Sequence, residues 1–211
     1  MAQRKDKKLL LPRGYLSPTQ LTLLETDEPE YIRRYIKGVR RDSNRFQEFG
    51  STIARVLEGA EDGDPIADLL RHTVKRYKKP EHELRATLKL QGSEIELFGK
   101  PDSYDDEPDH SIEEYKTGKW KWTPAKVKKQ GQTLFYATMV WINHKVLPKE
   151  IGLTWAQTEE TEDGEIYLTG KVERFPIVYT TADVLSMMNR MHKAAKRIDE
   201  LYRAEISDIF S

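Results

Sequence analysis

The sequence contains no cysteine among its 211 residues. This absence excludes disulfide bonds, zinc sites built from thiolates and iron–sulfur clusters held by cysteine. A fold without disulfides does not depend on an oxidising compartment, and we therefore expect a cytoplasmic protein.

Net charge and long apolar runs are also missing. The chain has 35 basic and 35 acidic residues, and this balance argues against a histone-like or tail-driven binder, although local basic patches can still act. The basic N-terminus carries only three leucines, Leu9–Leu11, before Pro12, which is too few for a signal peptide or a membrane span. We therefore expect no membrane partner.

The residues that are present are sufficient for one sizeable core. Charged residues make up 33% of the chain, yet apolar and aromatic residues are spread along it, which is typical of a soluble globular protein. Periodicity predicts helices, three strands, a helix, two strands and a final helix. A helix that crosses between strands indicates an α/β fold with a mixed sheet and helices packed on it. We expect residues 1–15 to be a flexible basic N-terminus and residues 16–211 to form a single domain.

The expected elements can be assigned to residue ranges. Helices are predicted at 16–25, 28–36, 43–60, 64–77, 125–144 and 182–205. Strands are predicted at 83–90, 94–102, 110–118, 150–159 and 166–179. Gln91–Ser93 is the expected hairpin turn between the first two strands.

Two carboxylates and a lysine lie at the second and third predicted strands. Asp102 ends one strand, and Glu114 and Lys116 lie two apart on the next, so those two side chains share a face. If these strands pair, Asp102 reaches the same place. Carboxylate oxygens suit Mg²⁺ or Mn²⁺, and a lysine can assist a metal-bound water or neutralise charge on a phosphate. The set is suited to hydrolysing phosphodiester bonds, whereas a solvent-facing charged strand is the alternative explanation.

A polar pair follows on the predicted helix at 125–144. Gln132 and Tyr136 are one turn apart on one face, beside the apolar stripe of the helix rather than within it. They can belong to the same site. Alternatively, Tyr136 packs in the core and Gln132 lies at the surface.

Taken together, these segments resemble the PD-(D/E)XK nucleases of the RecB-like exonuclease group. The matching segments are LSPTQL at 16–21, FGSTIARVLEG at 49–59, GKPD at 99–102, IEEYKTG at 112–118 and QTLFY at 132–136. The resemblance implies a restriction-endonuclease-like core, in which a central mixed β-sheet is flanked by helices. It also implies one or two Mg²⁺ or Mn²⁺ ions and the hydrolysis of DNA.

Carried over position by position, the resemblance implies roles for individual residues. Asp102 and Glu114 would be metal ligands, and Lys116 would be the catalytic lysine. The residues that shape the site or touch the nucleic acid would include Gln132, Tyr136 and Ser17.

Three departures from the family pattern change what we expect. Ala54 stands where the helix usually offers a metal-binding histidine. Glu58, one turn on, is either a replacement metal ligand or a solvated helix end. The absence of cysteine excludes the iron–sulfur cluster that many of the resembling enzymes carry. Glu113 stands at a usually apolar position on the face opposite Glu114, so it should meet a cation or a partly open surface.

Two basic segments are candidates for contact with DNA. The first follows the strand at 110–118 and consists of Lys119, Trp120, Lys121 and Trp122. Its lysines can contact phosphates, and its tryptophans can stack on bases or pack against the sheet. The second contains Arg33 and Arg34, which can line a groove or face solvent. The five histidines show no spacing typical of a zinc site.

The leading hypothesis is a divalent-metal-dependent DNA nuclease, expected to be an exonuclease in DNA repair, recombination or phage DNA processing. The alternative is a catalytically weak or silent nuclease-fold module that binds DNA or a protein. A homo-oligomer, or a subunit of a recombination complex, is also open. The chain has no Gly-x-x-x-x-Gly-Lys-Ser/Thr sequence, so motor-driven DNA processing would need a partner.

Overall fold

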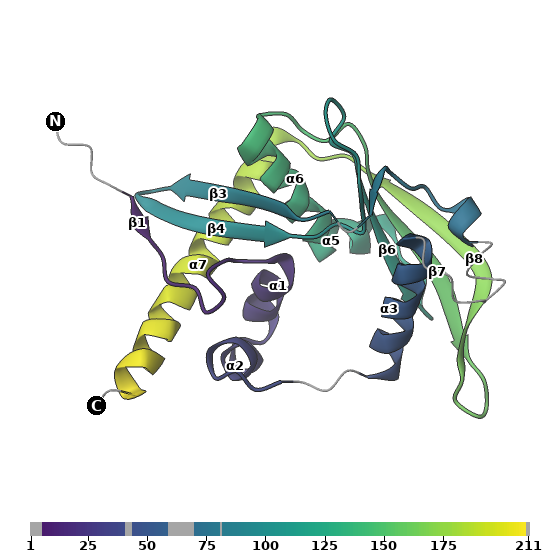
Figure 1. Cartoon of the computed structure of the whole chain (residues 1–211), viewed down its shortest axis with the longest axis horizontal. Helices are drawn as coiled ribbons and strands as arrows, with labels where there is room; N and C mark the ends of the chain where they lie inside the picture. Colours follow the sequence, from purple (N-terminus) through teal and green to yellow (C-terminus); the bar gives the residue numbers. More distant parts are fainter. Residues whose placement is uncertain (1–5, 41–43, 59–69, 81, 210–211) are drawn as a thin grey trace.

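The computed structural model describes residues 6–40, 44–58, 70–80 and 82–209 of the chain. Its strands form two sheets, one of five strands and one of three, and helices pack around them (Figure 1). The expected α/β fold with a mixed sheet and flanking helices is thereby confirmed. None of the helices in the described ranges is long and apolar enough to cross a membrane.

The five-stranded sheet carries the predicted site residues. Its strands, in spatial order, are β2 (Lys79–Pro80), β5 (Ser103–Tyr104), β6 (Ile112–Gly118), β7 (Ile151–Glu160) and β8 (Ile166–Ile177). β6 and β7 are parallel, and the other neighbouring pairs are antiparallel. A parallel pair needs a crossover connection, and two helices between β6 and β7 supply it.

The three-stranded sheet is built around the predicted hairpin. It consists, in order, of β1 (Lys7–Lys8), β4 (Ser93–Gly99) and β3 (Leu84–Leu90). Gln91 and Gly92 connect β3 to β4 with φ of 50° and 74°, the positive values that a type I′ hairpin turn requires. β1 pairs with β4, and Leu9 and Leu11 are buried. This part of the N-terminal segment 1–15 therefore packs against the sheet.

Helices surround both sheets. They are α1 (Pro18–Thr26), α2 (Glu28–Tyr31), the π-helix η1 (Ile32–Ile36), α3 (Arg45–Glu58), α5 (Pro124–Gln130), α6 (Gln132–His144) and α7 (Thr181–Ile209). The Ser17 hydroxyl accepts a hydrogen bond of 3.4 Å from the backbone N–H of Gln20 and so caps α1, which Pro18 opens. The predicted helix at 64–77 lies largely outside the described residues, although 70–73 are helical.

The prediction of one long helix at 125–144 is wrong. α5 ends and α6 begins at Gly131, whose φ of 76° lies in the left-handed region that glycine adopts without steric cost. Because of this break, Gln132 becomes the first residue of α6 instead of an interior position of a continuous helix.

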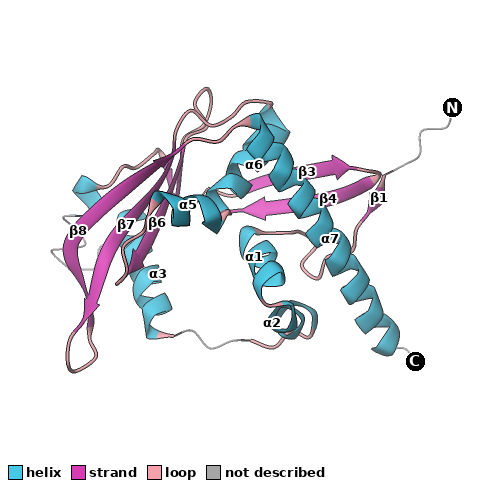
Figure 2. Cartoon of the chain, turned by 180° about the vertical axis from the view of Figure 1, so that it is seen from behind, coloured by secondary structure: helices cyan, strands magenta, loops and turns pink. Residues whose placement is uncertain are grey.

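The two faces of β6 and β7 are covered by different helices (Figures 1 and 2). α3 packs on one face, where Ile53 and Leu57 cluster with Tyr115 of β6. α5 packs on the other, where Val127 clusters with Trp155 of β7. α6 and α7 join α1 and the three-stranded sheet in a third and larger apolar cluster. Successive side chains of β6 therefore point into different surroundings.

Candidate active site

Asp102 lies in the turn between β4 and β5, at the edge of β6. Its Oδ2 accepts a hydrogen bond of 2.6 Å from the backbone N–H of Tyr115, which fixes the carboxylate beside β6. On this side β6 pairs with β5, which begins directly after Asp102 and places Ser103 opposite Glu113. The condition considered from the sequence, that the strand ending at Asp102 pairs with the next one, is not met, because β4 belongs to the other sheet; Asp102 reaches β6 from the turn after β4.

Glu114 is almost completely buried, with 1% of its surface exposed. Its Oε1 accepts hydrogen bonds from the Lys116 ammonium, at 2.6 Å, and from the side-chain amide of Gln132. Its Oε2 has no hydrogen-bond partner among the described residues. Burial, together with the charge of Asp102, raises the pKa of Glu114 to about 8. An unpartnered buried carboxylate oxygen is costly, and a bound cation would remove that cost.

Lys116 supplies positive charge beside the two carboxylates. Burial disfavours the charged amine, but Glu114 and Asp102 outweigh that effect and raise the pKa of Lys116. The ammonium is therefore charged at neutral pH. The predicted side-by-side placement of Glu114 and Lys116 is confirmed, because the two side chains form a salt bridge on one face of β6.

Gln132 and Tyr136 extend this network from α6. Gln132 Nε2 donates hydrogen bonds to Glu114 Oε1 and to the Tyr136 hydroxyl, the latter at 2.9 Å. The Tyr136 hydroxyl donates in turn to the backbone carbonyl of Lys100 at 3.1 Å. Gly99 makes room for the Tyr136 ring, since a Cβ at that position would lie 2.7 Å from it. α6 is thereby tied both to Glu114 and to the turn that follows β4.

A cavity of about 700 Å³ opens beside these residues. Lys116 lines it from β6, Asp102 from the turn after β4, and Thr19 from α1. Ala54 lines it from α3, so the position at which the resemblance implies a histidine does face the site. Glu58, the candidate replacement ligand, is the last residue of α3, and its side chain lies outside the described part of the chain.

Two smaller cavities continue past the first turn of α1. Thr19 lines these two as well as the larger cavity, and Gln132 lines both smaller ones. Their volumes are about 300 Å³ and 260 Å³. Ser17 and Tyr136 line the 300 Å³ cavity, which brings the predicted Ser17 next to the Gln132 network.

The two predicted arginines separate in the structure. Arg34 lines the 260 Å³ cavity and also a basic cavity of about 460 Å³, which it shares with Arg13 and Arg40. Arg33 is held instead by Glu30 in an exposed ion pair with two hydrogen bonds of 2.6 and 2.8 Å. The structure therefore brings Arg34, and not Arg33, towards the cavities.

The four residues of the predicted lysine–tryptophan segment, Lys119 to Trp122, also have different surroundings in the structure. Trp120 is 76% exposed and lines a cavity of about 280 Å³ with Lys119 and Phe46. Trp122 packs on the apolar cluster of α5, β7 and β8, and Lys121 forms a 2.8 Å ion pair with a glutamate of β8. Phe46 also lines the 700 Å³ cavity, so Lys119 and Trp120 lie next to the site, whereas Trp122 has a packing role.

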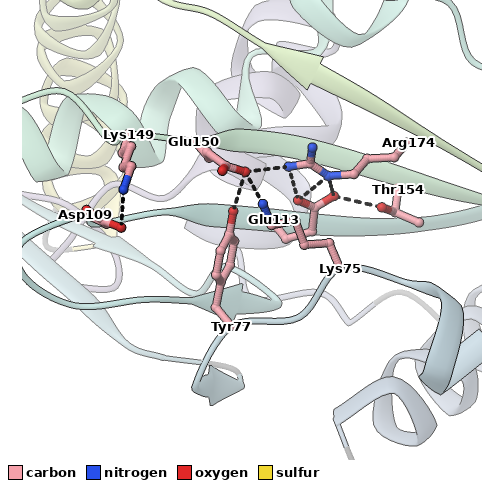
Figure 3. Close-up of polar contacts among 8 residues, drawn as sticks. All are labelled: Lys75, Tyr77, Asp109, Glu113, Lys149, Glu150, Thr154 and Arg174. Carbon is pink, nitrogen blue, oxygen red and sulfur yellow. Dashed lines mark hydrogen bonds and ion pairs between the residues drawn. The ribbon is translucent and has the colours of Figure 1, made fainter.

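Glu113 lies on the opposite face of β6 and is fully buried (Figure 3). Both of its oxygens accept hydrogen bonds from the Arg174 guanidinium, at 2.8 to 3.2 Å, and the Thr154 hydroxyl donates to Oε1 at 2.8 Å. Burial raises the pKa of Glu113, while Arg174 and Thr154 oppose that rise. Glu150 connects Arg174 to Lys75 through two further ion pairs. The expectation that Glu113 meets a cation is confirmed.

Sequence reasoning missed several residues that line the cavities. Periodicity assigns Phe46 to the apolar stripe of α3, but it lies in the first turn of the helix and is 48% exposed. Thr19 and Arg13 carry no local pattern that could reveal them. Only the packing of α1 and its preceding loop against the rest of the fold places them beside the site.

Comparison with known proteins identifies a family. Residues 66–210, which are more than half of the chain, match the sequence model of the PD-(D/E)XK nuclease superfamily. Comparison of the sequence with curated proteins gives no match.

Two solved structures share the fold. A protein from Eubacterium rectale described as a candidate exonuclease superposes with a TM-score of 0.58, at 14% identity, over 92% of this chain and 83% of its own. LHK-Exo, solved in complex with dAMP, superposes with a TM-score of 0.52, at 12% identity, over 94% of this chain and 95% of its own. At such low identity, the likeness shows the fold alone.

Proposed function

The chain belongs to the PD-(D/E)XK nuclease superfamily, and from that premise we propose that it is a divalent-metal-dependent exonuclease acting on DNA. The observation that carries this proposal is a buried oxygen of Glu114 that has no hydrogen-bond partner in the described ranges and lies beside Asp102 and Lys116. The choice of DNA is supported by LHK-Exo, which was solved with a deoxynucleotide. Such an activity would serve DNA repair, recombination or phage DNA processing.

The carboxylates of Asp102 and Glu114 fit a hard divalent cation. Mg²⁺ and Mn²⁺ prefer oxygen ligands, and Mg²⁺ is usually held by one or two carboxylates together with water and substrate phosphate. Nearby positive charge would also favour the ionised form of Glu114, whose pKa burial raises to about 8. When bound, the metal would supply Lewis-acid stabilisation of the phosphate and a more acidic water.

The chain's own residues prepare the site for a phosphodiester. Lys116 keeps its charge and lines the cavity, so its ammonium can stabilise negative charge that develops on the phosphate. Gln132 orients Glu114 through its amide, and the backbone of Tyr115 orients Asp102. These contacts hold the two carboxylates in place before any ligand binds, which lowers the cost of organising the site.

The adjoining cavities suggest a path for the DNA strand. Thr19 lies between the 700 Å³ cavity and the two smaller ones, Ser17 lines the 300 Å³ cavity, and Arg34 adds positive charge further along. Lys119 and Trp120 line a further cavity that shares Phe46 with the 700 Å³ cavity, where the lysine can contact phosphate and the exposed indole can stack on a base. We assign Arg33, Lys121 and Trp122 a secondary role, because each already has a partner within the chain.

The experiment that tests the proposal is a degradation assay on 5′- and 3′-labelled linear and circular DNA with Mg²⁺, Mn²⁺ or EDTA. Linear DNA should be degraded from an end with either metal and remain intact in EDTA. Lys116→Ala should abolish degradation, whereas Lys193→Ala, which removes an exposed lysine of α7, should not. Wild-type activity in Lys116→Ala would contradict the mechanism, and cutting of circular DNA would contradict the exonuclease mode.

A second candidate function is a nuclease-fold module that binds DNA or a protein without cleaving it. Ala54 favours it, because this alanine lines the 700 Å³ cavity where the resemblance implies a metal-binding histidine. The second function requires that DNA binding persist while no Mn²⁺ binds at Asp102 and Glu114. A calorimetric Mn²⁺ titration therefore separates the two functions.

A further inference from the structure

A second group of possible metal ligands lies at the other end of β6, before its first residue. Glu107 and His110 belong to the loop between β5 and β6, and His144 is the last residue of α6. Each offers one ligand atom, and these three atoms lie within 4.8 Å of one another. In sequence, His110 and His144 show no zinc-like spacing; the fold brings them together.

His110 is positioned as a metal ligand would be. It is buried, with 3% of its surface exposed, and its Nδ1 lies 2.7 Å from the hydroxyl of Tyr104. Histidines that bind metals almost always use their second ring nitrogen in a hydrogen bond that fixes the ring. With Nδ1–H donating to the Tyr104 oxygen, Nε2 keeps a lone pair for a metal. Tyr104 is itself buried between His110 and the stacked ring of His82.

His144 and Glu107 complete the group from the solvent side. His144 Nδ1 lies 3.5 Å from Glu107 Oε1. Two ligands about 2.0–2.1 Å from a tetrahedral zinc ion are roughly 3.3–3.4 Å apart, so this pair already has nearly the required spacing. The His144 ring stacks on His110 with 4.1 Å between the centroids. The side chains of His144 and Glu107 are 35% and 76% exposed, so a metal can reach them and small rotations can close the remaining gap.

We propose that Glu107, His110 and His144 form a second metal site, which takes Zn²⁺ or a similar transition-metal ion and is separate from the site at Asp102 and Glu114. Two imidazoles and one carboxylate are a donor set that zinc accepts, with a fourth position left for water. The oxygen-only pair of Asp102 and Glu114 instead suits Mg²⁺ or Mn²⁺. The different donor types would let the two sites bind different metals.

The proposed zinc site would join two elements that carry active-site residues. The loop holding Glu107 and His110 leads directly into β6, which carries Glu114, and His144 ends α6, which begins with Gln132. Lys149 also holds this loop. Its ammonium donates a hydrogen bond of 2.9 Å to the carboxylate of Asp109, the neighbour of His110 (Figure 3). A zinc ion would therefore stabilise the relative placement of β6 and α6, and its removal should loosen both.

The test is calorimetric titration of the metal-free full chain with Zn²⁺ in the presence of excess Mg²⁺. The experiment is repeated on Asp102→Asn, in which the proposed catalytic metal site is weakened. One Zn²⁺ per chain should bind in both proteins, and the thermal unfolding midpoint should rise with Zn²⁺. His144→Ala and Glu107→Gln should each weaken Zn²⁺ binding by more than about tenfold. Loss of a residue that only orients a metal ligand already lowers metal affinity by roughly 10- to 100-fold, and loss of the ligand itself should lower it more.

The matched control is His72→Ala, which removes an exposed histidine outside the cluster and should leave Zn²⁺ affinity unchanged. Unchanged Zn²⁺ affinity in both His144→Ala and Glu107→Gln would overturn the proposal, and so would the absence of Zn²⁺ binding in excess Mg²⁺. Either result would leave the proposed nuclease function standing, because that function is tested separately by DNA degradation with Mg²⁺, Mn²⁺ or EDTA and not by Zn²⁺ binding.

Discussion

Glu113 and Glu114 are adjacent on β6 and equally buried, yet the two faces of the strand offer their carboxylates different hydrogen-bond partners. Glu113 is held by the Arg174 guanidinium and the Thr154 hydroxyl, so both of its oxygens are satisfied. Glu114 keeps one oxygen without a partner in the described part of the chain, next to a second carboxylate. A fold that satisfies one buried acid so completely shows what a structural carboxylate requires. The unsatisfied neighbour is therefore the one we assign to ligand chemistry.

The largest expected effect comes from Glu114→Gln. The amide keeps the shape of the side chain but cannot supply a charged oxygen ligand, so DNA degradation with Mg²⁺ or Mn²⁺ should fall by at least about 100-fold. Stability should change little, because removal of a buried and incompletely paired carboxyl offsets the loss of its ion pair with Lys116, which keeps Asp102 nearby. Activity assays and urea unfolding on the same preparation check both parts. Normal activity in Glu114→Gln would contradict the assignment of Glu114, and not Glu113, to metal binding.

Glu113→Gln should show the reverse pattern. Replacing the buried Glu113 carboxylate leaves the Arg174 guanidinium without its main partner, and breaking fully buried pairs costs about 3–5 kcal/mol. The loss here should be smaller, roughly 2–3 kcal/mol, because Arg174 is partly exposed and also faces Glu150. Urea unfolding measures this change. Activity per folded molecule should remain within about threefold of wild type, and a larger loss at full stability would assign Glu113 to the site.

The pH dependence of stability should also reveal Glu114. Its pKa is about 8 in the folded protein and 4.5 for the unperturbed group, so the folded state holds more protons between these values. The free energy of unfolding of the metal-free protein should therefore fall as pH rises from about 4.5 to about 8. Glu113 contributes in the same direction because its pKa is also raised. Urea unfolding in EDTA across this range should show a shallower slope for Glu114→Gln, and an unchanged slope would contradict the account.

A smaller and opposite effect is expected from Ala54→His. This residue lines the cavity opposite Asp102 and Lys116, so an imidazole there can add a ligand and tighten Mn²⁺ binding by about tenfold. The matched control is Arg55→His, which puts the same side chain at an exposed position of α3. Equal affinity in the two variants would show that position 54 of α3 does not reach the bound metal.

The site was predictable where its residues are close in sequence. Glu114 and Lys116 share a face because strand geometry alternates side chains, and one strand suffices for that inference. Asp102 was expected beside Glu114 only if the two predicted strands pair; it lies there although β4 and β6 belong to different sheets. β5 has only two residues, which is too short to show a strand periodicity, so its pairing with β6 was not visible.

Contacts between residues far apart in the chain could not be predicted from the sequence. Arg174 meets Glu113 across 61 positions of the chain, and no local pattern connects them. Gly131 breaks a helix whose periodicity continues on both sides, and a single glycine inside a helix costs only about 1 kcal/mol. Thr19 and Ala54 come to face the same cavity from α1 and α3, which depends on the packing of both helices. These contacts require the folded chain.

The most direct measurement of the central claim is calorimetric titration with Mn²⁺. It should be made in a His144→Ala background, so that the cluster with Glu107 and His110 does not contribute. We predict that the background protein and its Glu113→Gln derivative bind Mn²⁺ with similar affinity, while the Glu114→Gln derivative loses binding. Equal Mn²⁺ binding with and without the Glu114 carboxylate, or no binding in the background protein, would contradict the assignment of this face of β6 to metal-dependent catalysis.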